Sequence, residues 1–151
     1  PQDLPFLALY LVDANETTVR RVGLVGQSDD SEVVPETSSL HASYRWPFQE
    51  AFETGRAVEV DRLSQRFGEV FDQSGTALIE QAIVIPLATA GSGRPIGLMV
   101  AAISPRRPLD ESYRGFLELL AKQLGAAITN VLVLEEERIR LIELAESERW
   151  E

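Results

Sequence analysis

A single histidine and the absence of cysteine set narrow limits on the chemistry available to this sequence. Among its 151 residues, His41 is the only imidazole, and there is no thiol. Disulfides, thiolate metal sites, thiol catalysis and a thioether-linked chromophore are therefore excluded. One imidazole can neither build the common multi-histidine metal sites nor identify a Ser-His-Asp triad. We predict no metal site, and His41 is either a pocket residue or an ordinary loop residue.

The other chemically suggestive features also lack a catalytic pattern. Acidic residues are abundant, yet no spacing singles out a pair of carboxylates for acid–base work, so we predict no catalytic residue and no enzyme activity for this chain. The GSGR stretch of Gly91 to Arg94 lacks the Gly-Lys-Ser/Thr ending of a phosphate-binding loop and joins two apolar runs. It predicts a hairpin turn.

The elements that would position these residues follow from apolar periodicity and turn residues. Residues 6–12 and 17–25 predict a hairpin of two strands, and the polar stretch 27–39 predicts a loop. Pro47 and Gly55 bracket a two-turn helix, and residues 57–60 predict a brief strand before a mixed segment at 61–76. The two most apolar runs, 81–90 and 95–104, predict a central hairpin, with a bulge or strand end at Pro86.

A long helix is predicted from Glu111 to about Arg149, with Asp110 as its N-cap. No proline interrupts this segment. Gly115 and Gly125 cost helix propensity, and we expect them where the helix approaches the sheet closely.

The same helix carries an apolar series at spacings of three and four residues, as in a coiled coil. After Leu134 the segment holds seven Glu and three Arg, so a thin apolar seam runs through a charged helix. We predict a parallel homodimer through this helix. The alternative is a terminal helix packed only on its own sheet. The predicted dimer residues are Leu117, Leu120, Leu124, Ala127, Val131, Leu134, Leu141 and Ala145.

Charge and hydropathy exclude further classes of partner. The net charge of −10 repels nucleic acid and anionic membrane surfaces, and no apolar run approaches the roughly 20 residues that span a bilayer. We predict a cytoplasmic protein with no nucleic-acid partner and no membrane insertion. The start at Pro1 and the end within a helical pattern indicate a piece of a longer protein, with an output domain downstream.

Three stretches resemble the GAF domains of bacterial sensor histidine kinases and related multidomain signalling proteins. They are DLPFLALYLVD at residues 3–13, TGRAVEVD at 54–61, and the run from AIVIPLATA to LGAAITN at 82–130. The resemblance implies an α+β fold related to PAS domains, in which an antiparallel sheet is flanked by helices and the long C-terminal helix extends as a coiled coil. It implies a GAF domain at residues 1–130 and a helical signalling linker at 131–151.

The resemblance also implies a ligand cavity on the sheet face opposite the terminal helix. The cysteine that anchors a bilin, the thiols of methionine-sulfoxide-reducing members and the signature of cyclic-nucleotide-binding members are missing, so no covalent bilin or other cofactor is predicted. A small planar or apolar ligand could bind there, or the same side chains could form a filled core. The candidate residues are His41, Tyr44, Trp46, Phe48, Phe52, Phe67, Phe71, Ile83, Ile85 and Met99.

Three functions remain open at this point. The first is a non-catalytic sensory or regulatory input domain of a two-component or similar signal-transduction protein, which passes ligand- or partner-induced changes to an output domain through a dimeric helix. The second is a structural dimerisation module without a ligand. The third, a small-molecule enzyme, lacks a nucleophile or a second imidazole to support it.

Overall fold

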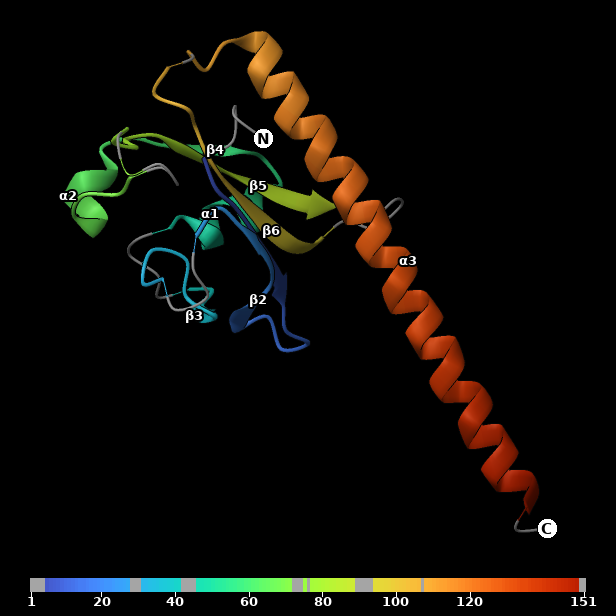
Figure 1. The fold of residues 1–151 in the computed structure, drawn as a ribbon. Helices are drawn as coiled ribbons and strands as arrows, with labels where there is room; N and C mark the ends of the chain where they lie inside the picture. Colours follow the sequence, from blue (N-terminus) through green and yellow to red (C-terminus); the bar gives the residue numbers. More distant parts are fainter. Residues whose placement is uncertain are drawn as a thin grey trace.

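One antiparallel sheet of six strands, in the order β3-β2-β1-β6-β5-β4, organises the chain (Figure 1). The computed structural model describes residues 5–27, 31–41, 46–71, 75, 77–88, 94–106 and 108–149. α3 crosses one face of the sheet, and α1 and α2 lie on the other. The elements are β1 (Leu7–Val12), β2 (Thr18–Val25), β3 (Thr37–Ser39), α1 (Phe48–Thr54), β4 (Val58–Val60), α2 (Leu63–Phe67), β5 (Ala82–Ala88), β6 (Pro95–Ala102) and α3 (Glu111–Arg149).

The first hairpin, β1–β2, is confirmed, and the side chain of Asp13 organises its turn. Asp13 accepts hydrogen bonds from the backbone N–H groups of Thr17 at 2.7 Å and Thr18 at 3.2 Å. An Asp side chain that binds the backbone ahead of it is a common way to hold a turn. The prediction of a loop over 27–39 is wrong at its end, because β3 pairs there with β2 along residues 37–39.

The apolar hairpin β5–β6 forms the centre of the sheet, as predicted. Neither a bulge nor a strand end lies at Pro86, which pairs with Leu98 inside β5; the register shifts only between Leu87 and Ala88. The short strand β4 pairs with β5 only as far as Val84. Pro86 lies beyond that pairing, so its missing N–H costs no hydrogen bond to β4.

Capping residues mark the end of α1 and the start of α3, as predicted. Gly55 adopts a left-handed conformation with φ 67° at the end of α1, and its N–H binds the carbonyl of Ala51. Asp110 Oδ1 accepts a hydrogen bond of 2.9 Å from the N–H of Tyr113, which confirms it as the N-cap of α3. The expected close approach at Gly115 is wrong, because this glycine is exposed and a methyl group there would have open space.

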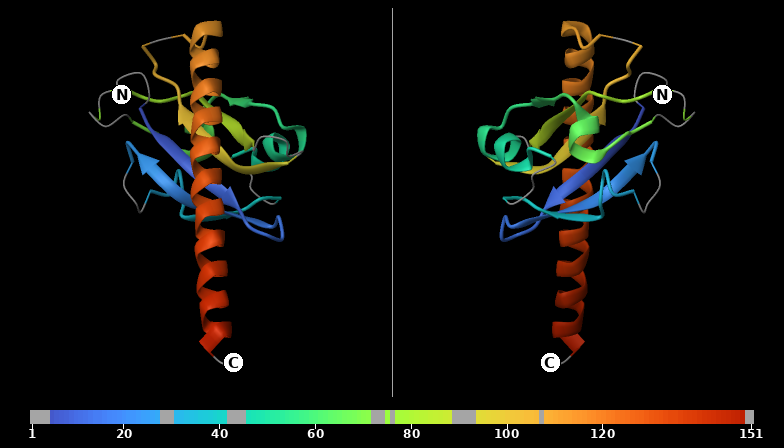
Figure 2. Two further views of the ribbon diagram at one scale, coloured as in Figure 1. Left: turned by 90° about the vertical axis from the view of Figure 1, so that its right-hand side faces the viewer. Right: turned by 90° about the vertical axis from the view of Figure 1, so that its left-hand side faces the viewer.

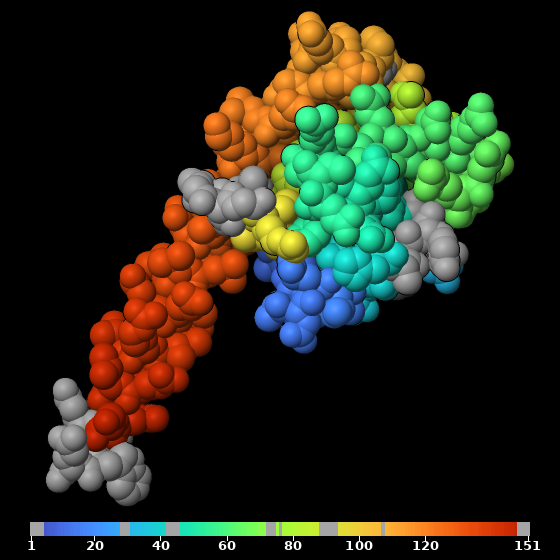
Figure 3. All heavy atoms as spheres, turned by 180° about the vertical axis from the view of Figure 1, so that it is seen from behind, coloured from blue at the N-terminus to red at the C-terminus, as the bar shows by residue number. Residues whose placement is uncertain are grey.

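Two separate apolar cores lie on the two faces of the sheet. The α1 face, which we define as the face covered by α1, α2 and the segments beside them, buries Trp46, Phe48 and Val100. The α3 face buries Met99 together with Leu117 of α3. α3 runs diagonally across its face and then leaves the domain (Figure 2). Figure 3, seen from behind, shows α1 and the chain around it over the sheet and the distal half of α3 clear of the body.

Candidate functional site

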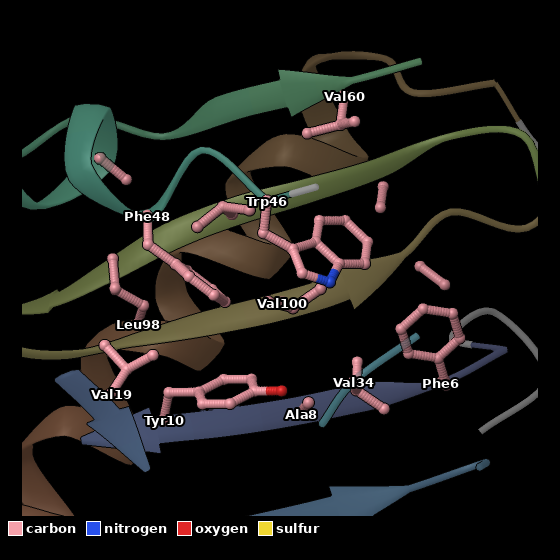
Figure 4. Packing of buried hydrophobic residues seen from close by; sticks show 14 of the residues in the cluster. Phe6, Ala8, Tyr10, Val19, Val34, Trp46, Phe48, Val60, Leu98 and Val100 are labelled. Atoms are coloured by element: carbon pink, nitrogen blue, oxygen red, sulfur yellow. The ribbon is translucent and has the colours of Figure 1, made fainter. Parts of the chain in front are cut away.

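Aromatic side chains pack on the α1 face, among them Trp46 and Phe48 of the predicted ligand pocket (Figure 4). The rings of Tyr10 and Phe48 have centroids 5.1 Å apart at an interplanar angle of 53°. Those of Trp46 and Phe67 are 4.8 Å apart at 38°. Tilted pairs at these separations are favourable aromatic contacts. Trp46, Phe48 and Phe52 are at most 4% exposed.

The polar atoms of this aromatic cluster are engaged by the backbone of the segment between β2 and α1. The Tyr10 hydroxyl donates to the carbonyl of Pro35 at 2.7 Å, and Trp46 Nε1 donates to the carbonyl of Val33, also at 2.7 Å. Burial raises the pKa of the Tyr10 phenol well above its usual value, although the charge of Arg21 partly opposes this. The phenol therefore stays protonated as a donor. These contacts favour a filled core over a ligand pocket for this part of the face.

Three of the predicted pocket residues lie on the wrong face. Ile83, Ile85 and Met99 belong to the cluster beneath α3. Because side chains alternate between the faces of a strand, their neighbours point the other way, onto the α1 face. The residues that sequence reasoning missed there are Val84, Leu98 and Val100.

The remaining predicted pocket residues do not join the aromatic cluster. His41 is exposed, and its Nε2 lies 2.8 Å from the carbonyl oxygen of Glu16 in the β1–β2 turn. Phe71 is 40% exposed and forms an isolated bridge with Leu78. Tyr44 lies outside the described residues, as do Gly91 to Gly93 of the predicted hairpin turn. Within the part of the chain that the structure describes, no three His, Asp or Glu side chains gather as metal ligands would.

A hollow of about 410 Å³ opens where α3 leaves the sheet. Of the predicted pocket residues, it includes Phe52. Its rim carries an ion pair in which Arg94 Nη1 lies 2.7 Å from Glu16 Oε1, and the Arg94 guanidinium lies 5.6 Å from the centre of the Phe52 ring. The lining residues are Leu11, Val12, Asp13, Glu16, Arg20, Phe52, Pro95, Ile96 and Leu132.

A second hollow, of about 440 Å³, lies between α3 and the β4–β5 edge. Ile83 and Ile85 form part of its wall. Arg114 at the start of α3 closes one side, where its Nε donates to Glu59 Oε2 at 3.0 Å. The hydrogen bond with Glu59 raises the pKa of Arg114.

Asp13→Asn is expected to remove part of the acid sensitivity of the domain. The backbone bonds from Thr17 and Thr18 hold the Asp13 pKa at about 2, below its usual 3.8. Because the folded pKa is the lower one, the stabilisation is fully present above pH 3.8 and fades as the pH falls toward 2. In urea titrations at neutral pH, the wild type should have a higher unfolding midpoint than the variant. The difference between the two midpoints should disappear as the pH falls through that acid range. A gap that stays constant down to pH 2 would contradict the assignment.

The eight predicted dimer residues on α3 divide between two environments. Leu117 is fully buried, and Leu120 and Leu124 pack partly buried against the same sheet-side cluster. The prediction is therefore wrong for Leu117, because its own sheet occupies the position of a partner helix. The five others, which are exposed, are Ala127, Val131, Leu134, Leu141 and Ala145.

α3 is long and apolar enough, by length and composition, to cross a membrane. Between Glu111 and Ser147 it contains a stretch of mean hydropathy 1.4, of which 17% is buried. Core helices of soluble proteins can pass the same test. Burial of Tyr113, Leu117 and Ala121 against the sheet shows that α3 contributes to the core of the domain.

Comparisons with known proteins agree with this architecture. The family model of the GAF domain matches residues 3–129. The GAF domain of a two-component sensor histidine kinase from Bacillus halodurans is 13% identical, with a TM-score of 0.61 and coverage of 87% of this chain and 86% of that one. The GAF domain of a phosphoenolpyruvate-protein phosphotransferase from Coxiella burnetii is also 13% identical, with a TM-score of 0.64 and coverage of 88% and 76%.

A third similar structure is an enzyme. A type II free methionine-R-sulfoxide reductase from Thermoplasma acidophilum is 13% identical, with a TM-score of 0.56 and coverage of 82% of this chain and 77% of that one. At such identities the likeness shows the fold alone. No curated protein sequence matches significantly. On the strength of the family match, which spans most of the sequence, and of the sheet and helices described above, this chain belongs to the GAF domain family.

Proposed function

We propose that this chain is a non-catalytic sensory or regulatory input domain of a cytoplasmic signal-transduction protein, such as a histidine kinase of a two-component system. It passes changes induced by a ligand or partner to a downstream output domain through α3, paired in parallel with α3 of a second copy. The continuity of α3 carries this proposal. Leu117 and Ala121 are buried under the sheet, and the same unbroken helix continues to Arg149.

The hollow at the exit of α3 supports a sensory role. Leu132 of α3 lines it together with Leu11 of β1 and Ile96 of β6. A small apolar molecule in this hollow would contact both the sheet and the departing helix. A ligand can shift an equilibrium only through different contacts in the two states, and this position provides contacts that depend on the placement of α3.

The absence of cysteine supports a non-catalytic role. One structure similar to this chain is a free methionine-R-sulfoxide reductase. GAF-type enzymes that reduce methionine sulfoxide use thiols, and this sequence contains none. Sulfoxide reduction through cysteine is therefore unavailable to it.

A structural dimerisation module without a ligand is the second candidate, and the aromatic cluster favours it. Ring contacts fill the space beside α1, and backbone carbonyls engage the Tyr10 hydroxyl and the Trp46 indole N–H. A domain with this core needs no ligand to satisfy those groups.

A two-stage experiment separates the two candidates. The 151-residue chain is screened by thermal shift against a library of metabolites, and any stabilising compound is then tested by hydrogen exchange. A sensory domain should yield a compound that raises the Tm and changes exchange in residues 131–149 of α3. A compound that stabilises the sheet and leaves α3 unchanged would contradict transmission through the helix. A library without any stabilising compound would favour the structural module.

A further inference from the structure

A row of residues across three strands brings a positive charge beside apolar surface where α3 leaves the sheet. Arg20 of β2 lies opposite Leu11 of β1, and Leu11 lies opposite Gly97 of β6. Residues directly opposite one another on antiparallel strands point to the same face of a sheet. Arg20 and Leu11 both line the hollow at this place, together with Leu132 of α3. Gly97, the third residue of the row, adds no side chain.

Ile96 adds to the apolar lining because of an irregularity in β6. In the pairing with β5, Gly97 and Pro95 have partners, and Ile96 between them has none. An extra residue of this kind bulges from the ladder and can aim its side chain in a new direction. Ile96 packs against the cluster beneath α3 and lines the hollow. We call Leu11, Ile96 and Leu132 the apolar wall, to which β1, β6 and α3 each contribute one residue.

The acidic side chains of the hollow are engaged within the domain, whereas Arg20 is not. Both carboxylate oxygens of Asp13 accept hydrogen bonds from the backbone and hydroxyl groups that follow it in the turn. Both oxygens of Glu16 contact Nη1 of Arg94, at 2.7 and 2.5 Å. Arg20 is exposed and has no carboxylate partner among the residues that the structure describes. Its guanidinium is therefore open to a ligand.

We propose that this hollow binds a small amphipathic carboxylate, such as a medium-chain fatty acid, with the carboxylate on the Arg20 guanidinium and the hydrocarbon chain on the apolar wall. A guanidinium matches a carboxylate through two parallel hydrogen bonds. Each methylene group that leaves water adds to the affinity. The volume of about 410 Å³ falls within the range of roughly 300–1,000 Å³ that small-molecule sites occupy. The choice of this hollow rests on the proposed function, since the sensory role uses the same place.

The acidic character of the whole chain does not prevent an anion from binding here. The net charge is −10. At physiological ionic strength, however, exposed charges more than about 8 Å apart are largely screened from one another. The two carboxylates that line the hollow are held by the partners described above, so Arg20 is the charge that a ligand meets.

NMR titrations of the 151-residue chain test the chemistry of the ligand with four probes. Octanoate has both the negative charge and the chain, octanol has the chain alone, octylamine has the chain with a positive charge, and acetate has the charge alone. Octanoate should bind at least about fivefold more tightly than each of the other three. Equal affinity for octanol, tighter binding of octylamine, or no binding of octanoate would overturn the carboxylate class.

Two pairs of variants test the place of binding. Arg20→Gln should weaken octanoate binding at least about fivefold and remove its advantage over octanol, whereas Arg56→Gln, at an exposed arginine of the second hollow, should change it little. Leu132→Ala should weaken binding about threefold, and Val131→Ala, at a neighbour 65% exposed, should not. These side chains are all at least partly exposed, so the variants should keep the wild-type fold. Unchanged octanoate binding in Arg20→Gln would overturn the site.

Hydrogen exchange separates failure of the ligand class from failure of the sensory role. Octanoate bound at Arg20 should change exchange in residues 131–149 of α3, because Leu132 contacts the ligand. Binding that depends on Arg20 but leaves α3 unchanged would support the carboxylate site and contradict transmission through the helix. A different compound that changes exchange in α3, in a chain that does not bind octanoate, would overturn the carboxylate site and leave the sensory role standing.

Discussion

Replacing Gly97 with alanine is expected to lower the free energy of unfolding by about 3 kcal/mol or more. Gly97 lies in β6, the strand between β1 and β5. A Cβ atom at this position would meet the backbone oxygen of Tyr10 at 2.0 Å and the Cα of Leu11 at 3.2 Å. Backbone atoms cannot rotate away as a side chain can, so β1 and β6 would have to separate. Urea unfolding followed by circular dichroism measures the change.

Gly23→Ala is the matched control for this effect. Gly23 also lies within the sheet, opposite Leu9, but a Cβ there would meet only the Leu9 side chain, at 3.3 Å from Cδ1. That side chain can adjust by a few tenths of an ångström. The control should unfold within about 1 kcal/mol of the wild type. Equal losses in the two variants would show that backbone approach at Gly97 is not the cause.

Leu117→Ala should remove about 2–5 kcal/mol from the free energy of unfolding and loosen α3 from the sheet. Leu117 is fully buried in the cluster that includes Met99 and Ala101. Truncation leaves a cavity between the helix and the sheet, which only partial relaxation can fill. The substitution should increase the rate of hydrogen exchange more in residues 111–128 than in β1, because the shortened side chain no longer anchors α3 on the sheet.

Val131→Ala is the control on the same helix. Val131 is 65% exposed, so its truncation removes little buried surface. Alanine also has the higher helix propensity. Its free energy of unfolding should stay within about 0.5 kcal/mol of the wild type. A loss as large as that of Leu117→Ala would mean that the packing of α3 on the sheet extends beyond Ile128.

Local signals were sufficient for most elements of the fold. Gly55 predicted the end of α1, and Asp13 holds the first turn; each acts on backbone groups only a few residues away. β3 had no such signal. Thr37, Ser38 and Ser39 show no apolar alternation, and their strand exists because β2 offers them an edge to pair with.

The side chains facing the candidate site were less predictable. Along β5 and β6, residues on both faces are apolar, so no alternation shows which of Ile83 and Val84 faces α1. A choice that is wrong by one residue moves every side chain to the other face. The packing of α3 decides which side chains face it, and α3 is a separate element later in the sequence.

The predicted dimer residues of α3 were difficult to identify from the sequence for a related reason. α3 carries apolar residues on more than one side, and periodicity alone does not separate those that its own sheet covers from those that remain exposed. The structure places Leu117 in the first group and Leu141, which is 67% exposed, in the second.

Attachment of α3 on one side and near one end gives this helix the properties of a lever. Its fulcrum lies among Leu117, Ala121 and Ile128, the residues that contact the sheet. From Ile128 to Arg149 the helix extends by about 32 Å at 1.5 Å per residue. A tilt of about 5° at the fulcrum would displace the far end by about 3 Å over that length. A small tilt at the sheet would thus move the end of the helix by about the donor–acceptor distance of a hydrogen bond.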